Sequence, residues 1–375
     1  MTSTAAPATT TDSHVIAETR RHVGVLTLNR PNALNALSLQ MIRDLTQALL
    51  AWRDDANVTT VVLRGNGRPG KAPAFCAGGD IRWFHGAALA GNPELEDFFT
   101  EEYALNHLIH EYPKPVVALM DGVTMGGGMG ISQGAAMRVV TEHSKLAMPE
   151  THIGLFPDVG GGWFLARLHG HVGEYLSLTG HVLGAADALA VGWADLHVPS
   201  ASLDALVDAV VGAATADAAG GSRALEAVRA FATDAGPAAL PDHYPLIDRV
   251  FAADTVREIV EALRATPDPF AEAAVEVLLH RSPLMLHVTL AQVRRARTMT
   301  LAEDLRMERD LVRHCFHLRP GAASETVEGI RALVIDKDHS PNWNPARIED
   351  VDASDVAAFF ESPWPAWAHP LRALT

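Results

Sequence analysis

Residues 75–80 read FCAGGD and residues 124–130 read TMGGGMG, and these two glycine-rich segments decide how the whole sequence is interpreted. Because glycine has no Cβ, the backbone N–H groups of both segments can approach a single oxygen atom of a ligand. We expect the second segment to enter a helix near Gly127, where the helix dipole favours negative charge. Taken alone, each segment is better explained as a turn.

Two carboxylates follow within a short distance along the chain. Residues 148–150 read MPE and residues 154–162 read GLFPDVGGG, so Glu150 and Asp158 are eight residues apart. A glycine and a proline between them prevent one continuous helix, so both side chains can flank the same reacting carbon as acid and base. The four segments in this order favour an active site over four unrelated turns.

Short β-branched runs alternate with helical patterns through the first half of the chain. Strands are predicted at residues 23–28, 58–63, 116–119 and 137–141. Ser38 is predicted to cap a helix whose apolar residues follow helical spacing. This alternation indicates an α/β fold.

Helical signals dominate the second half of the chain. Two Thr-x-x-Glu capping boxes, at residues 255–258 and 300–303, predict helix starts, and so does Ser282 followed by proline. Residues 213–221 are predicted to form a loop. A β-branched run at residues 332–335 ends the mainly helical part.

Composition excludes several classes of protein. The chain has 375 residues and a formal net charge of −15, which argues against nucleic-acid partners because these require Lys and Arg over a wide surface. Two cysteines are too few for a disulfide framework, and no apolar stretch predicts a membrane span. Residues 1–14 contain no Lys or Arg and are predicted to be a disordered tail. A cytoplasmic protein without nucleic-acid or membrane partners is expected.

Several other motifs have a plainer explanation. Residues 65–72, GNGRPGKA, match nucleotide-binding templates only in part and are predicted to be a surface turn. Ser132 lies in a G-x-S-x-G pattern, but we expect it inside a helix because no strand runs directly into it. Cys76 has no neighbouring base and is expected to be a packed residue. The histidines lack metal-ligand spacing, so no metal site is predicted.

In the order of its four segments, the chain resembles the enoyl-CoA hydratase/isomerase (crotonase) superfamily, and within it the 3-hydroxyisobutyryl-CoA hydrolases. The resemblance covers roughly residues 15–345. It implies a crotonase-type spiral core of repeated ββα units over residues 15–205, followed by a mainly helical region over residues 206–375. It also implies an acyl-CoA substrate, no cofactor besides the coenzyme A of that substrate, and it leaves a homo-oligomer open.

The resemblance also assigns residues of this sequence to the substrate. It implies that the backbone N–H groups of Ala77 and Gly127 bind the thioester oxygen. It implies further substrate-binding positions, of which the two basic residues would lie near CoA phosphates: Gly78, Gly79, Asp80, Gly126, Glu102, Arg30 and Lys71. A solvated helix position remains an equal alternative for Glu102, and a solvated surface role remains one for each basic residue.

One departure from the hydratases decides the expected reaction. The resemblance places a catalytic glutamate of hydratases at Gly130 and a glycine of hydratases at Asp158. Because Gly130 cannot transfer a proton, the Glu150 and Asp158 pair implies hydrolysis of a thioester, that of 3-hydroxyisobutyryl-CoA in valine breakdown. Glu150 would attack the thioester or activate water, and Asp158 would protonate the leaving thiolate or orient water. An enoyl-CoA hydratase or isomerase and a non-catalytic acyl-CoA-binding scaffold are the alternatives.

Overall fold

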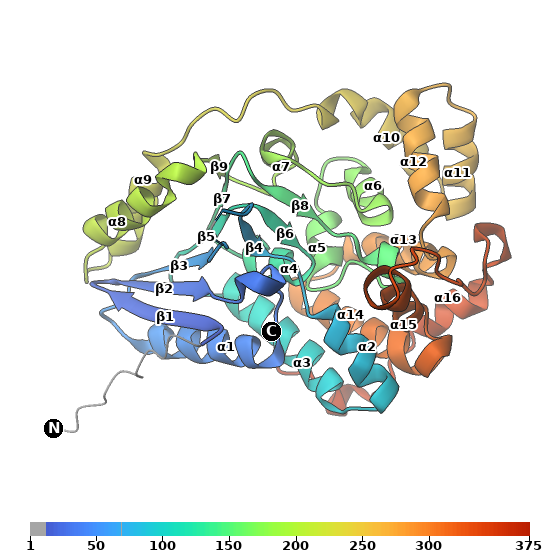
Figure 1. Cartoon of the computed structure of the whole chain (residues 1–375), viewed down its shortest axis with the longest axis horizontal. Helices are drawn as coiled ribbons and strands as arrows, with labels where there is room; N and C mark the ends of the chain where they lie inside the picture. Colours follow the sequence, from blue (N-terminus) through green and yellow to red (C-terminus); the bar gives the residue numbers. More distant parts are fainter. Residues whose placement is uncertain (1–12, 69) are drawn as a thin grey trace.

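The computed structural model describes residues 13–68 and 70–375 (Figure 1). The tail predicted over residues 1–14 lies outside the described residues, except for its last two. The first strands and α1 (Leu39–Asp54) occupy one end of the molecule, and the C-terminal helices occupy the other. In the part of the chain that the structure describes, no helix has the length and apolar character needed to cross a membrane.

Two sheets form the core of the first half. The larger sheet has the order β1-β2-β3-β5-β7-β9, with β1 and β2 antiparallel and the other neighbours parallel, and the smaller parallel sheet has the order β4-β6-β8. The strands are Val15–Arg20 (β1), Val23–Leu28 (β2), Thr60–Gly65 (β3), Ala74–Cys76 (β4), Val116–Met120 (β5), Val123–Met125 (β6), Met137–Val140 (β7), Lys145–Ala147 (β8) and Leu196–His197 (β9).

Consecutive strands of the core enter different sheets. The strands β3, β5 and β7 join the larger sheet, and β4, β6 and β8, which follow them along the chain, join the smaller one. A helical segment follows each pair of strands, so every ββα turn adds one strand to both sheets. This topology confirms the predicted spiral of ββα units.

Helices connect the strands of the core and then form the C-terminal region, as predicted. Besides α1, the helices of the first part are Ile81–Ala90 (α2), Glu94–His110 (α3), Gly127–Gln133 (α4), Gly161–Leu165 (α5), Val172–Thr179 (α6) and Ala185–Val191 (α7). Those that follow β9 are Leu203–Ala213 (α8), Gly220–Arg229 (α9), Tyr244–Phe251 (α10), Val256–Arg264 (α11), Pro269–Leu279 (α12), Pro283–Ala296 (α13), Leu301–His317 (α14), Glu325–Ile330 (α15) and Ala353–Phe359 (α16).

The helix caps follow the predicted chemistry. Ser38 accepts a hydrogen bond from the backbone N–H of Met41 at the start of α1. Both capping boxes are present, at the starts of α11 and α14, and Ser282 caps α13. These caps satisfy N–H groups that have no acceptor within the first turn of a helix, so the sequence alone located these helix starts.

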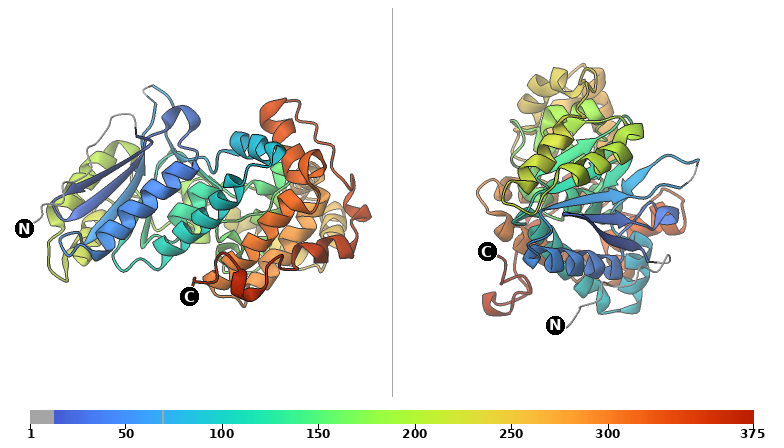
Figure 2. Two further views of the ribbon diagram at one scale, coloured as in Figure 1. Left: turned by 90° about the horizontal axis from the view of Figure 1, so that it is seen from below. Right: turned by 90° about the vertical axis from the view of Figure 1, so that its left-hand side faces the viewer.

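The larger sheet is covered by helices on both faces (Figure 2). A separate apolar cluster joins its strands to α8 and α9, with Val25, Val62, Leu206 and Val210 buried in it. The expected boundary between residues 205 and 206 therefore falls inside α8, a helix that packs on the core. The core thus extends beyond the predicted boundary, because its sheet needs apolar cover on this face as well.

Other predicted bounds shift by a few residues. The strand predicted at residues 58–63 begins at Thr60, since Val58 still belongs to the turn that follows α1. The β-branched run at residues 332–335 forms a π-helix, Arg331–Ile335, that continues α15. Packing against α2 and α15 overrides the β propensity of these residues.

Candidate active site

The carboxyl ends of β4, β6 and β8 open into one cavity of about 570 Å³. Because these strands are parallel neighbours, the segments that follow them meet at the same sheet edge. The cavity is lined by the predicted segments and by a wall from the C-terminal region: Ala77, Gly78, Gly79, Asp80, Gly126, Gly127, Pro149, Glu150, Glu102, Asp158, Leu333 and Val334. The structure thus brings all four predicted segments together.

Both glycine loops carry backbone N–H groups without an acceptor among the described residues, including those of Gly79 and Gly127. The N–H of Gly127 lies in the first turn of α4, where no helical acceptor exists. The N–H of Gly79 is also unpaired, because Leu37 bonds to Gly78 and to Asp80 on either side of it.

The assignment of Ala77 as an oxyanion donor does not agree with the structure. The N–H of Ala77 donates to the carbonyl oxygen of Leu34 at 3.0 Å, so it is already occupied. Two residues further along the chain, the N–H of Gly79 has no acceptor among the described residues, and we take it as the available donor of this loop. Pairing with residues 34–37 decides this, and the spacing of glycines in the sequence carries no signal for it.

The two glycine loops touch each other at this corner of the cavity. A Cβ added to Gly78 would lie 3.7 Å from the backbone nitrogen of Gly127 and 3.3 Å from the carbonyl oxygen of Met125. Gly78 has φ +102° and Gly126 has φ +49°, a region that favours glycine. Glycine is therefore required here both for backbone conformation and for the close approach of the loops.

Three buried carboxyl groups line the same cavity. Glu102 is on α3, Glu150 begins a 3₁₀ helix, and Asp158 lies in the loop before α5. Glu150 Oε1 lies 3.0 Å from where a Cβ on Gly126 would be, and Glu102 Oε1 fills the position of a Cβ on Gly127. Glu102 is only 2% exposed, so the solvated alternative for this residue is wrong.

Burial raises the pKa values of all three carboxyl groups. Asp158 accepts a hydrogen bond from the hydroxyl of Tyr103 at 2.8 Å, which limits the rise of its pKa to about 6. For Glu150 and Glu102, burial and then the charge of Asp158 raise the pKa well above its usual range. Glu102 Oε1 and Glu150 Oε2 are buried without a partner, so both can receive a hydrogen bond from a ligand.

A fourth buried carboxyl group, which the sequence analysis did not single out, holds the loop that carries Asp158. Glu308 on α14 accepts hydrogen bonds from the backbone N–H groups of Gly160 and Gly162 at 2.7 and 2.9 Å. Gln292 on α13 donates to the carbonyl oxygen of Pro157 and to Glu308. Their backbone partners in the loop are 135 to 148 residues away along the chain, so local patterns gave no signal for these contacts.

The sequence profile of the enoyl-CoA hydratase/isomerase family matches residues 23–360. This chain belongs to that family. The match runs through the two glycine loops, both carboxylates and the helices that support them.

Individual relatives carry two kinds of names. The chain is 42% identical to the mitochondrial 3-hydroxyisobutyryl-CoA hydrolase of Rattus norvegicus over 94% of this chain and 90% of that protein. Among solved structures, a carnitinyl-CoA dehydratase of Mycobacterium thermoresistibile is 37% identical, with a TM-score of 0.83 over 93% of this chain and 97% of that one. An enoyl-CoA hydratase of Rhodobacter sphaeroides is 38% identical, with a TM-score of 0.83 over 94% and 98%.

Gly130 is tightly enclosed in this member of the family. A Cβ added to it would lie 2.6 Å from the Cβ of Val159 and 2.9 Å from Nδ2 of Asn106. Contacts below 3.0 Å require a shift of the surrounding atoms. A glutamate therefore does not fit at this position without rearrangement of the loop that carries Asp158.

The predicted basic residues lie at the rim of the site or outside it. Arg30 donates to Asp80 at 2.7 Å, and Asp80 in turn caps α2, so this ion pair joins the two loops that flank the entrance. Lys71 is exposed in the loop before β4 and is not among the residues that line the cavity. Arg82 on α2, which flanks the first glycine loop in the sequence as Lys71 does, lines the cavity.

The competing motifs have structural roles. The Ser132 hydroxyl is buried in α4 and donates to the carbonyl oxygen of Gly128, which confirms its helical position. Burial raises the pKa of the Cys76 thiol to about 12, as expected for a packed residue. Within residues 13–68 and 70–375, no group of three His, Cys, Asp or Glu side chains is arranged to hold a metal ion.

Proposed function

We propose that this chain hydrolyses a short branched 3-hydroxyacyl-CoA thioester, 3-hydroxyisobutyryl-CoA, to the free acid and CoA. The observation that carries this proposal is the site's acid–base pair, Glu150 with Asp158, combined with a packed glycine at position 130. The rat relative's name supports the same reaction at 42% identity. Hydration needs a second proton-transferring side chain at the position of Gly130, and none is present there.

In the proposed reaction, the thioester oxygen accepts hydrogen bonds from the N–H groups of Gly79 and Gly127. These donors stabilise the negative charge of the tetrahedral intermediate, and each such donor typically contributes about 3 kcal/mol to the transition state. The C–S bond then breaks, and the thiolate of CoA leaves with a proton. Glu102 contacts the acyl portion through its unpaired oxygen.

Glu150 acts on the carbonyl carbon in one of two ways. As a base, it takes a proton from water while the resulting hydroxide adds to the carbon. As a nucleophile, it forms a mixed anhydride that water then opens. Asp158, held by Tyr103, orients the water or supplies the proton to the leaving thiolate. A single turnover in heavy-oxygen water tests the nucleophilic route, because the label enters Glu150 only when water opens a mixed anhydride at the Glu150 carbonyl carbon.

A panel of three CoA thioesters tests the proposal against its alternatives. We expect free thiol from 3-hydroxyisobutyryl-CoA and no loss of enoyl absorbance from crotonyl-CoA. Loss of that absorbance without thiol release would establish a hydratase, as in the names of the two solved structures. Binding of acetyl-CoA with neither signal would indicate a scaffold without turnover.

Location and assembly are separate questions from the reaction. The rat relative is named as mitochondrial, so the cytoplasmic location expected from the sequence remains a prediction. A homo-oligomer also remains a prediction, and light scattering on the purified chain measures it directly.

A further inference from the structure

A second cavity, of about 700 Å³, adjoins the active site. His152 and Leu333 line both cavities, so the two spaces share part of a wall. Four basic side chains line the second cavity: His152, His280, Arg281 and His339. We call this space the cationic cavity.

Arg281 in the cationic cavity has no acidic partner among the described residues. One of its terminal nitrogens donates to the carbonyl oxygen of Thr179, and its Nε is buried without an acceptor. Burial alone lowers the pKa of Arg281 to about 10. Glu276 also lines the cavity, but no contact joins its carboxylate to Arg281. The guanidinium therefore carries a positive charge that the protein itself leaves uncompensated.

Three histidines, His152, His280 and His339, line the same cavity. Burial first, and then the positive charge of Arg281, lower the pKa of His152 to about 4, so His152 is neutral at pH 7 and can donate one hydrogen bond to a ligand. No carboxylate is among the groups that act on His152. Arg281 is thus a cation without a carboxylate partner in a chain whose formal net charge is −15. Such groups gain the most from an anionic ligand.

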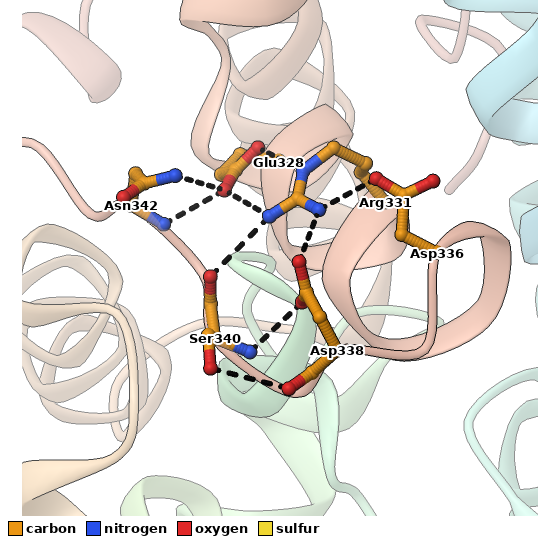
Figure 3. A network of polar contacts seen from close by, with 6 residues as sticks. All are labelled: Glu328, Arg331, Asp336, Asp338, Ser340 and Asn342. Carbon is orange, nitrogen blue, oxygen red and sulfur yellow. Dashed lines mark hydrogen bonds and ion pairs between the residues drawn. The ribbon is translucent and has the colours of Figure 1, made fainter.

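The wall that carries His339 is fixed in place. Arg331 bonds to Glu328, Asp336 and Asp338, and Glu328 also accepts from the backbone N–H of Asn342 (Figure 3). His339 has φ +53°, a conformation that costs energy for a residue with a side chain. The network of Arg331 holds this strained segment, which also brings Ser340 and Pro341 to the cavity.

Arg331 and Arg281 thus differ sharply within one region. The chain supplies three carboxylates to Arg331 and none to Arg281. We propose that the cationic cavity binds a small oxyanion, a carboxylate or a phosphate, through Arg281 with His339 and His280. The proposed reaction offers two molecules that carry such an oxyanion: the free carboxylic acid and CoA, which carries phosphates.

Isothermal titration calorimetry with the full chain tests the site with two probes, 3-hydroxyisobutyrate and adenosine 3′,5′-bisphosphate. We expect at least one of them to bind, and R281M to weaken that binding roughly 10-fold or more, since a charge-assisted hydrogen bond is lost. The probe that binds identifies the source. R281K should retain most of the affinity because it keeps the charge.

Two further variants keep the test decisive if R281M folds poorly. H339Q changes an exposed side chain, so it should fold and should weaken binding severalfold. R257M removes an exposed arginine of α11 and should leave binding unchanged. Binding of neither probe, or equal binding by wild type, R281M and H339Q, overturns the proposal. Since the readout is binding, that outcome leaves the proposed hydrolysis untouched.

Discussion

Glu150 and Glu308 are both buried glutamates near the same loop, yet their surroundings are opposite. Glu150 lines the cavity, and its Oε2 has no partner in the described part of the chain. Both oxygens of Glu308 are used, by two backbone N–H groups and by Gln292. Burial raises the pKa of each carboxyl well above its usual range.

This difference in hydrogen bonding distinguishes Glu150, a reactive carboxyl group, from Glu308, a structural one. A buried carboxylate without partners destabilises the fold, and a reaction can use this because a substrate supplies the missing interactions. A carboxylate that accepts several backbone hydrogen bonds stabilises the loop that it contacts. The two residues should therefore respond in opposite ways to the same change, glutamate to glutamine.

The largest effect is expected for E150Q. Removal of the base or nucleophile should lower kcat for thiol release by roughly 10³-fold, while binding of the acyl-CoA changes little. Because a buried charge is lost, the melting temperature should stay equal or rise. E226Q on α9, which is exposed, is the matched control and should keep full activity. Wild-type thiol release by E150Q would remove Glu150 from the mechanism.

The raised pKa of Asp158 predicts that the stability of the folded state depends on pH. Its pKa is raised from the ordinary 3.8 to about 6, so the folded state holds this proton more tightly than the unfolded state. The contribution of Asp158 to the free energy of unfolding is therefore fully present below about pH 4. It amounts to at most about 3 kcal/mol and is lost as the pH rises through about 6.

The asparagine of D158N does not titrate, so this variant does not lose stability in the same way as the pH rises. Its free energy of unfolding relative to wild type should therefore increase between about pH 4 and about pH 6. Urea unfolding of both proteins across this range measures the difference. D208N on α8, an exposed position, should show no such trend. A constant difference between D158N and wild type would contradict the raised pKa.

For E308Q we expect the reverse of the E150Q pattern. The new amide NH₂ faces backbone donors, so a hydrogen bond is lost and about 1 to 3 kcal/mol of stability goes with it. The loop of Asp158 loosens, and kcat should fall roughly 10-fold with little change in KM. E272Q, at an exposed position on α12, controls for the substitution. An E308Q variant as stable as wild type would show that the hydrogen bonds from Gly160 and Gly162 to Glu308 do not stabilise the folded state.

The last prediction, which concerns stability alone, tests the packing of Gly130 against the loop that carries Asp158. G130A places a methyl group against Val159, the residue between Asp158 and Gly160, and should cost about 1 to 3 kcal/mol. G212A, within α8, meets no atom within 4 Å and should be neutral or stabilising by up to about 1 kcal/mol. Thermal unfolding compares the two variants, and an equal response would show that Gly130 is not enclosed.

Much of the site could be predicted because its parts are local. The capping boxes, the glycine loops and the Glu150 and Asp158 pair each lie within a few residues, and the order of the segments identified the family. The resemblance also placed Glu102 near the acyl group, and the structure agrees in burying it. What sequence patterns describe well are turns, caps and strands.

The features that could not be predicted depend on contacts between distant segments. The N–H of Ala77 is occupied because residues 34–37 pair with its loop, and this moves the free donor to Gly79. Glu308 looks like an ordinary helix glutamate in sequence, and its role appears only when α14 packs behind the loop at residues 157–163. Likewise, residues 332–335 form a π-helix because of their neighbours.

The anchoring of residues 160 and 162 by Glu308 has a consequence for synthesis of the chain. The ribosome makes the glycine loops and both reactive acids before α14 exists, and the bond from Gly160 to Glu308 spans 148 positions. A nascent polypeptide that ends before α14 therefore lacks the support for its own reactive loop. Turnover should begin only once α14, Leu301–His317, has emerged and docked, which ties the onset of catalysis to completion of folding.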